Sequence, residues 1–447
     1  MEMLDAQRAV TRFDGVDVLR GFSILSVVLL HTWIRMHFPG SPVNQVMRGW
    51  LAHLLLRNGD NGVTVFFAVS GFLITLTSLR RFGSLAQMQP MRFYRIRFAR
   101  IAPLLLLLLA VLSVLHLVHA EGFRIPAKIT TLPRALFSAL TFHLNWLEAV
   151  HGYLPANWDV LWSLSVEEMF YLFFPLICVV VLRERRGMML FVALLLVFVA
   201  MGPFARTVWT TNPIWQEKTY LGGMDGIALG CLCALVTDRL LRRGDGWRAR
   251  WSKRLIVLEF LGAAMILLIA VWPPWHWMRC VGRSGVDGTV LAVGACLVMV
   301  GSVVRGRTGR RWTAPVRWFG RHSYEVYLTH EFVVVWGTML YIKLRRGPLP
   351  LWFFVILLLT APLGWLVAKY FSEPMNRRLK KRTPLLPHDF FFCGHKAGAG
   401  AGGKQITLFE ARRSRRPGHG RTEVCAAPFY RESFCAVLFR GAARGRR

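Results

Sequence analysis

The chain has 447 residues, of which 54% are hydrophobic and only 18% are charged, and its formal net charge is +32. This composition excludes an ordinary soluble domain and favours an integral membrane protein. The excess Lys and Arg residues lie in short loops between apolar runs, so they indicate membrane topology and not a surface that binds nucleic acid.

Ten apolar segments are each long enough to cross a bilayer, which takes roughly 20 helical residues. No long polar block separates them. We therefore predict an all-α, polytopic helical bundle of about ten transmembrane helices, forming one membrane domain over residues 1–382. A weaker segment around 133–150 carries Arg134, His143 and Glu148, and we expect it to be re-entrant or interfacial. The ten segments are 18–36, 61–79, 99–119, 163–183, 188–206, 219–238, 255–272, 286–304, 324–342 and 350–371.

The positions of the basic residues predict how the helices are oriented. If the N-terminus is cytoplasmic, the inside loops hold 29 Lys and Arg residues and the outside loops hold 11. We expect both termini to be cytoplasmic and the protein to lie in the cell inner (plasma) membrane. Residues 383–447 include a Gly- and Ala-rich run and a basic cluster at 412–416, which predict a disordered extension.

The first apolar segment carries two ionisable side chains, Arg20 and His31. Such groups are unfavourable in a spanning helix unless each has a partner or a task. A neutral imidazole can take a proton from a hydroxyl, so His31 is a candidate general base. The alternative is a hydrogen bond that joins two helices. Arg20 lies eleven residues earlier, about 16 Å along a helix at ~1.5 Å per residue, so we expect it to hold a phosphate or carboxylate at the cytoplasmic entrance.

The second segment contains Ser70 and Gly71, which we interpret as a site of close helix packing and not as a nucleophile. The following inside loop collects four arginines at the start of the next helix. They are candidates for binding an anionic head group or a nucleotide-bearing cofactor, although topology alone explains part of the cluster. These residues are Arg92, Arg95, Arg97 and Arg100.

The fourth segment opens with a polar stretch that includes two adjacent acids. We expect Ser163 to cap this helix, with Glu167 and Glu168 in its first turn. One of these acids is expected to orient a catalytic imidazole from a polar cavity.

In the ninth segment, Tyr327 and His330 are three residues apart and so share a helix face. His330 is a second candidate base, while packing is the simpler explanation for Tyr327. The substrate-binding candidates are Trp162, Ser163, Tyr171 and Tyr327.

Several sequence blocks, taken in chain order, resemble the acyltransferase 3 family of integral membrane acyltransferases, the O-antigen and nodulation-factor acetylase type. Thr64 and Met169 depart from that pattern, since an acid and Gln are common there. The matching blocks are Arg20-Gly21 with His31, Gly62-Val63 with Phe66-Phe67 and Ser70-Gly71, Arg100-Ile101 with Pro103, Trp162 to Glu168 with Tyr171, Ser323-Tyr324 with Tyr327-Leu328 and His330, and Glu373-Pro374.

The resemblance implies a membrane-bound acyltransferase that moves an acyl group, with acetyl as the first candidate, from acetyl-CoA or another acyl-CoA. The implied acceptor is a hydroxyl of a carbohydrate or glycolipid, such as a cell-surface polysaccharide. It also places Arg20 and His31 among the essential residues, with His31 as general base or transient acyl carrier. We expect no metal site, no permanently bound cofactor and no nucleic acid partner. A membrane transporter or flippase is the alternative function, since buried charges among ten helices also suit a substrate path.

Overall fold

The computed structural model describes residues 13–36, 54–56, 58–271, 285–344 and 347–381. Within these ranges the regular elements are helices and no strand occurs, so the prediction of an all-α, polytopic bundle is confirmed. The predicted C-terminal extension, 383–447, lies outside the described residues.

Nine stretches of the described chain are long and apolar enough to cross a membrane. They agree with nine of the ten segments predicted from the sequence. Their main helices are α2 (Asp14–Met36), α5 (Gly59–Phe82), α6 (Pro90–Leu117), α9 (Leu161–Val181), α10 (Gly187–Thr207), α12 (Tyr220–Leu241), α13 (Gly244–Val271), α15 (Val286–Val304) and α18 (Leu349–Val367).

The tenth predicted segment forms α17 (Ser323–Leu344), a helix of 22 residues that packs against α2 and α18. It is as long as its neighbours but is less apolar, because it carries Glu325, His330 and Glu331. All three of these side chains are buried. These three polar groups of α17 therefore face the interior of the bundle, where they meet the other helices.

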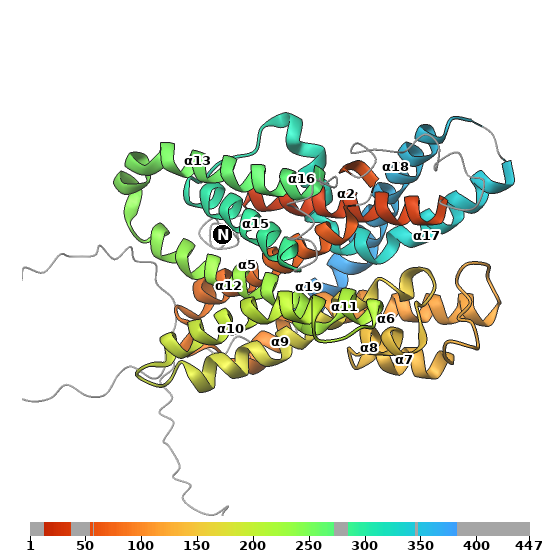
Figure 1. The fold of residues 1–447 in the computed structure, drawn as a ribbon, viewed down its shortest axis with the longest axis horizontal. Coiled ribbons are helices and arrows are strands. Elements are labelled where there is room, and N and C mark those ends of the chain that lie inside the picture. Colours follow the sequence, from red (N-terminus) through yellow and green to blue (C-terminus); the bar gives the residue numbers. More distant parts are fainter. Residues whose placement is uncertain (1–12, 37–53, 57, 272–284, 345–346, 382–447) are drawn as a thin grey trace, which may run out of the picture. The chain divides into compact units, whose positions relative to one another are not determined.

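Residues of the weaker segment form two short helices, α7 (Leu132–Leu140) and α8 (Leu144–His151). Neither reaches the roughly 20 residues that a crossing needs. They pack against each other, and α8 also contacts α9 and the short helix α11 (Pro213–Lys218), as Figure 1 shows. This agrees with an interfacial or re-entrant segment and not with an eleventh crossing.

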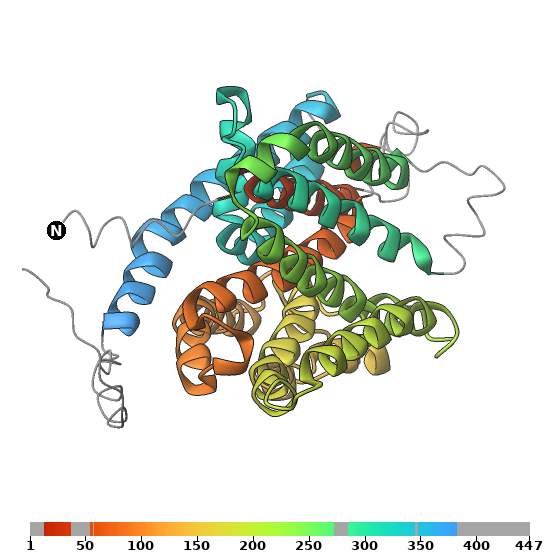
Figure 2. The ribbon, with the colours of Figure 1, turned by 90° about the vertical axis from the view of Figure 1, so that its left-hand side faces the viewer.

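Glycines allow α5 and α12 to approach each other closely. A Cβ atom at Gly71 would overlap the backbone carbonyl of Ile227, and one at Gly230 would overlap that of Ala68. Small residues at such crossings are typical of membrane helix pairs. The packing role predicted for Gly71 is confirmed, and Figure 2 shows the crossing helices from a second direction.

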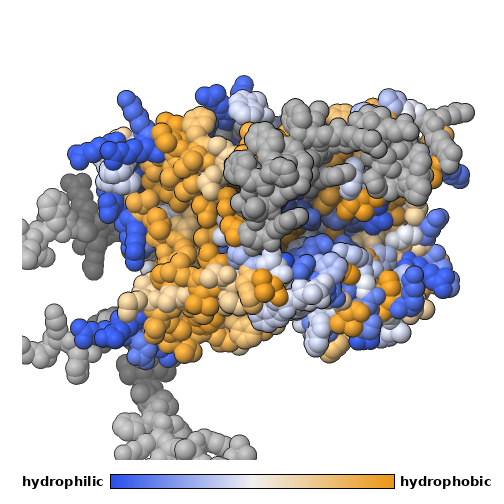
Figure 3. All heavy atoms as spheres, viewed as in Figure 1, coloured by the Kyte–Doolittle hydropathy of each residue, from blue (hydrophilic) through white to orange (hydrophobic). Residues whose placement is uncertain are grey.

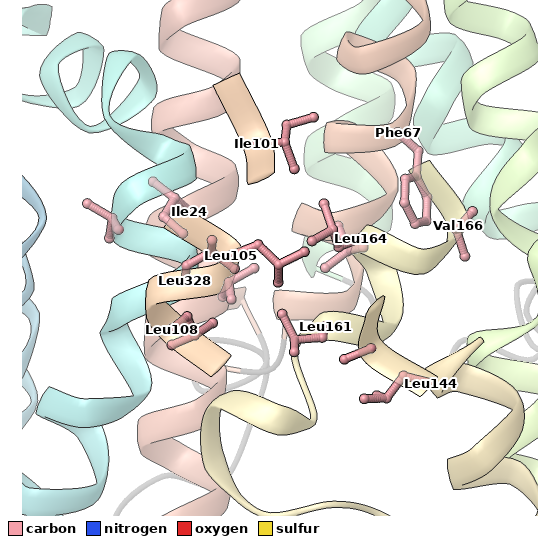
Figure 4. Close-up of a cluster of buried hydrophobic side chains, with 14 of the residues drawn as sticks. Ile24, Phe67, Ile101, Leu105, Leu108, Leu144, Leu161, Leu164, Val166 and Leu328 are labelled. Atoms are coloured by element: carbon pink, nitrogen blue, oxygen red, sulfur yellow. The ribbon is translucent and has the colours of Figure 1, made fainter. Parts of the chain in front are cut away.

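The interior and the exterior of the bundle are both apolar. Ile24, Leu105, Leu161 and Leu328 bring α2, α6, α9 and α17 together in one buried cluster (Figure 4). On the outside, large apolar side chains are exposed, including Phe260 at 72%. Figure 3 shows a broad hydrophobic region on one face with hydrophilic residues towards its margins. Such a surface suits contact with lipid.

Candidate active site

Two histidines from distant parts of the chain face each other between α2 and α17. His330 Nε2 lies 3.1 Å from His31 Nδ1, and the ring centroids are 5.0 Å apart. The two helices pack side by side (Figure 1), which joins residues separated by 299 positions. His330 is fully buried, whereas the side chain of His31 is 20% exposed. Both were candidate bases from the sequence, but their contact was not predicted.

A carboxylate and a guanidinium complete this cluster. Glu331 Oε1 lies 3.8 Å from His31 Nδ1 and 3.9 Å from His330 Nε2. Its other oxygen, Oε2, accepts a hydrogen bond from Arg35 Nε at 2.8 Å and lies 2.6 Å from a second Arg35 nitrogen. The ligand atoms of the two histidines and Glu331 all lie within 4.8 Å of one another, so they are also a candidate site for a divalent cation.

The sequence analysis did not single out Glu331 or Arg35. The available signal was the rule that an ionisable residue inside an apolar segment needs an explanation. Glu331 is such a residue within the apolar segment 324–342. Arg35 lies four residues after His31 and so shares its helix face.

A cavity of about 740 Å³ adjoins this region. Its only acidic lining residues within the described chain are Asp17 and Glu167, so its walls carry a clear positive excess. Guanidinium groups bind phosphate with paired hydrogen bonds, and this lining suits a ligand that bears several phosphates. The arginines that line it are Arg20, Arg80, Arg81, Arg97, Arg100 and Arg321.

The predicted arginine cluster divides between two faces of α6. Arg97 and Arg100 line the cavity, while Arg92 and Arg95 do not. Arg95 is exposed, and the guanidinium carbon of Arg92 lies 5.9 Å from the ring centre of Phe82. Residues three apart share a helix face, which explains why the four arginines separate into these two pairs.

Arg20 reaches the cavity from α2 and also joins this helix to α17. One of its guanidinium nitrogens donates a hydrogen bond to Ser323 Oγ at 2.7 Å. Arg20 with Ser323 and His31 with His330 are thus two successive contacts along the same helix pair. One contact lies at the cavity and the other lies in the histidine cluster.

Three predicted residues of α5 and α9 meet at the cavity wall. The Tyr171 hydroxyl donates to Glu167 Oε2 at 3.1 Å and is hydrogen bonded to Ser70 Oγ. The guanidinium carbon of Arg97 lies 4.1 Å from the centre of the Tyr171 ring. All four residues line the cavity. Ser70 therefore has a polar contact in addition to the packing role that we predicted.

The start of α9 differs from our expectation. A short 3-10 turn, Ala156–Trp158, leads into a helix that begins at Leu161. Ser163 therefore lies inside the helix instead of capping it, and its Oγ lies 3.3 Å from the carbonyl oxygen of Val160. For the same reason neither Glu167 nor Glu168 lies in the first turn.

The acid that lies beside the imidazoles belongs to α17 and not to α9, contrary to the prediction. Glu331 of α17 is the carboxylate that lies beside His31 and His330. Glu167 instead accepts from a tyrosine at the cavity wall, while Glu168 Oε1 is buried without a hydrogen-bond partner in the described chain.

Tyr327 links the cavity to the histidines. Its side chain lines the cavity, and its ring centre lies 5.9 Å from that of His330. The hydroxyl donates to the Val160 carbonyl at 3.0 Å and lies 2.6 Å from Ser163 Oγ. Trp162, the fourth substrate-binding candidate, instead packs edge-on against Phe67, with ring centres 6.1 Å apart.

Comparison with known proteins gives one family and several relatives. The model of the acyltransferase 3 family, described as an acyltransferase domain, matches residues 13–369. The chain is 24% identical to the O-acetyltransferase OatA of Staphylococcus aureus (strain NCTC 8325 / PS 47) in an alignment of 395 residues that covers 83% of this chain and 58% of that protein.

Two further relatives have names that mention peptidoglycan. The putative peptidoglycan O-acetyltransferase YrhL of Bacillus subtilis (strain 168) is 25% identical over 72% of this chain and 49% of its own length. The peptidoglycan O-acetyltransferase OatA of Listeria monocytogenes is 25% identical over 72% of this chain and 50% of its own length. The chain spans about half the length of these relatives. No solved structure matches it significantly.

Proposed function

The chain belongs to the acyltransferase 3 family, and we propose that it transfers an acyl group from an acyl-CoA thioester to a hydroxyl of a cell-surface polysaccharide. Acetyl is the first candidate for the acyl group, because the relatives are named O-acetyltransferases. A glycan of the peptidoglycan type is the first candidate for the acceptor, since two of those names specify it.

The cavity is the donor site in this proposal. A volume of about 740 Å³ lies within the range of ~300–1,000 Å³ that is common for small-molecule sites. Six arginines in its wall provide paired donors for the phosphates of CoA. These arginines belong to loops or helix ends that the distribution of charge assigns to the cytoplasm, where acyl-CoA is available.

His31 is the general base, and it acts on the acceptor hydroxyl. The hydroxyl oxygen attacks the thioester carbonyl while a ring nitrogen of His31 takes the hydroxyl proton. The tetrahedral intermediate then collapses, the C–S bond breaks, and the leaving thiolate takes the proton back from the imidazolium. The acyl group thus ends on oxygen, and His31 returns to its neutral state.

Glu167 and the arginines of the cavity act on the donor and not on the imidazole. Arg97, stacked on Tyr171 next to Glu167, lies where it can hold one phosphate group. Tyr327 separates this compartment from the histidines, so the acyl end of the donor reaches the reaction site past its ring.

The arginine-lined cavity beside the histidine cluster is the observation that carries this proposal. It is tested with labelled acetyl-CoA in membranes that contain matched levels of Arg97→Ala and Arg95→Ala. Both substitutions remove one positive charge from α6, but only Arg97 lines the cavity. We expect the KM for the donor to rise in Arg97→Ala and to stay near the original value in Arg95→Ala. Equal effects of the two substitutions would contradict a donor site in the cavity.

A transporter or flippase is the competing function. Such a protein moves its substrate across the bilayer without cleaving it, whereas an acyltransferase releases free CoA. Purified protein supplied with acetyl-CoA and a soluble glycan fragment should therefore release thiol in a manner that depends on His31. Movement of substrate without thiol release would favour the transporter.

A further inference from the structure

The protonation state of His330 follows from its neighbours. Its Nδ1 lies 2.7 Å from the carbonyl oxygen of Tyr327 and 3.3 Å from that of Val326. A carbonyl oxygen only accepts hydrogen bonds, so Nδ1 must carry the proton. In the neutral ring, Nε2 is then left with a free lone pair. This nitrogen faces His31 at 3.1 Å.

The same reasoning fixes the tautomer of His31. Its Nδ1 has two acceptors nearby, the Val27 carbonyl at 3.0 Å and the free lone pair of His330 Nε2 at 3.1 Å. Both contacts require a proton on Nδ1, so His31 Nε2 is the unprotonated nitrogen. The His31 side chain is 20% exposed, while those of His330 and Glu331 are almost completely buried. Of these three side chains, only that of His31 is therefore accessible to a substrate.

Glu331 supplies the charge that this arrangement needs once His31 is protonated. Arg35 holds Glu331 Oε2 through two nitrogens, at 2.8 and 2.6 Å. The other oxygen, Oε1, is buried and has no hydrogen-bond partner in the described chain, although it lies 3.8 Å from His31 Nδ1. A carboxylate at this distance attracts a positive charge that forms on the ring during transfer. Asp60, at the start of α5, is a second acid within electrostatic range of His31.

We propose that His330 and Glu331 are positioning residues: His330 holds His31 in the tautomer with Nε2 free, and Glu331 Oε1 stabilises the imidazolium that forms during transfer. The inference rests on the proposed role of His31 as general base. It resembles the division of labour in hydrolase triads, where a carboxylate orients an imidazole and stabilises its charged form. Here a second histidine performs the orienting function and the carboxylate performs the electrostatic one.

A metal ion would use the same three side chains in a different way. The three donor atoms, 3.1, 3.8 and 3.9 Å apart, lie at about 2.1 Å from a common point, which matches zinc-ligand bonds. A nitrogen that binds metal has no proton to donate, however. The 3.0 Å contact between His31 Nδ1 and the Val27 carbonyl would then be repulsive. The hydrogen-bonding pattern thus favours the positioning roles proposed for His330 and Glu331, an arrangement that we call the relay.

The first test compares Glu331→Gln with Arg35→Gln. Without the carboxylate, the protonated form of His31 is less stable, so the acidic limb of the pH profile for kcat should move to lower pH. We expect kcat to fall by at least ~10-fold while the donor KM changes little. Arg35→Gln leaves the Glu331 carboxylate without its countercharge, so the acidic limb of the pH profile for kcat should move to higher pH. If the ion pair between Glu331 and Arg35 had only a structural role, the two variants would not shift the pH profile in opposite directions.

The double variant Arg35→Gln/Glu331→Gln guards against a folding defect caused by one unpaired buried charge. If Glu331 serves only to neutralise Arg35, removing both restores kcat. The relay predicts that kcat stays low in the double variant even if the expression level and thermal stability of the protein return to those of the original. Glu325→Gln is the matched control, because this buried acid of the same helix bonds to Ser372 at 2.7 Å and not to either histidine.

A second readout does not depend on acyl transfer. Diethyl pyrocarbonate modifies unprotonated imidazole nitrogens, and mass spectrometry of the His31 peptide gives the rate of modification at each pH. The Glu331→Gln protein should shift this titration to lower pH even if no acceptor or donor has been identified. A shift here without acyl transfer from acetyl-CoA would reject the proposed function alone, whereas an unchanged His31 titration would overturn the relay.

Metal analysis of the purified protein tests whether these side chains bind a metal ion instead. The relay predicts less than one equivalent of transition metal and no loss of activity on treatment with a chelator. One equivalent of zinc that is lost in His31→Ala and in Glu331→Gln, together with activity restored by added zinc, would replace the relay with a metal site.

Discussion

The hydroxyl groups of Tyr327 and Ser163 lie 2.6 Å apart and join α17 to α9 in the wall of the arginine-lined cavity. The ring of Tyr327 also approaches His330, with centroids 5.9 Å apart. A single side chain therefore borders both the proposed donor compartment and the histidine cluster.

A double-mutant cycle should detect this hydrogen bond. Tyr327→Phe and Ser163→Ala should each lower the free energy of unfolding by about 0.5–1.5 kcal/mol, the usual net contribution of one hydrogen bond. The double variant should lose less than the sum of the two, because each single change already breaks the same contact. Thermal unfolding in detergent measures this coupling, and strict additivity would show that the contact does not stabilise the bundle.

Arg20→Lys should act mainly on the donor. Lysine keeps the positive charge but loses the planar fork, so the contacts with a phosphate and with Ser323 Oγ should weaken without disappearing. We expect the donor KM to rise several-fold while kcat stays near the original value, as measured by donor titration in membranes. A large loss of kcat with an unchanged KM would place Arg20 in the chemical step instead.

Gly71→Ala should destabilise the bundle, because the new Cβ would overlap the Ile227 carbonyl and α5 would have to move away from α12. Overpacking of this kind costs typically ~1–3 kcal/mol. The matched control is Gly246→Ala, where a Cβ would meet nothing within 4 Å. We expect a lower Tm for Gly71→Ala only. Equal Tm values would show that the two helices tolerate a wider separation.

Reporter fusions at Gly246 and Gly347 should test the predicted orientation. The first position belongs to an inside loop and the second to an outside loop of the ten-helix topology, in which α17 crosses the membrane. A cytoplasmic reporter should be active at Gly246 and inactive at Gly347. Activity of the same reporter at both positions would rule out the ten-helix topology.

Hydropathy and charge predicted the helices well, because each spanning segment must satisfy its own backbone hydrogen bonds and present apolar side chains to lipid. The packing role of Gly71 was also predictable, since a small residue in an apolar helix has few other uses. The domain boundary at residue 382 and the character of the chain beyond it stay predictions.

The contacts between helices were harder to predict. Periodicity gives the face on which His31 or His330 lies, but not which of the other helices packs against that face. The meeting of these two residues over 299 positions therefore required the tertiary structure. Arg95 and Arg97 show the same limit, because one short sequence cluster supplied both a cavity residue and an exposed one.

Turnover of the His31→Ala protein is the most direct test of the central claim that His31 is the general base. Membranes with matched levels of the original protein and the variant are supplied with labelled acetyl-CoA at a series of concentrations, and transfer to glycan is measured. A general base contributes typically ~100- to 10,000-fold to rate, so we predict a loss of kcat of that size with a nearly unchanged donor KM and normal insertion. Near-normal kcat in His31→Ala would contradict the account and shift the role of base to His330.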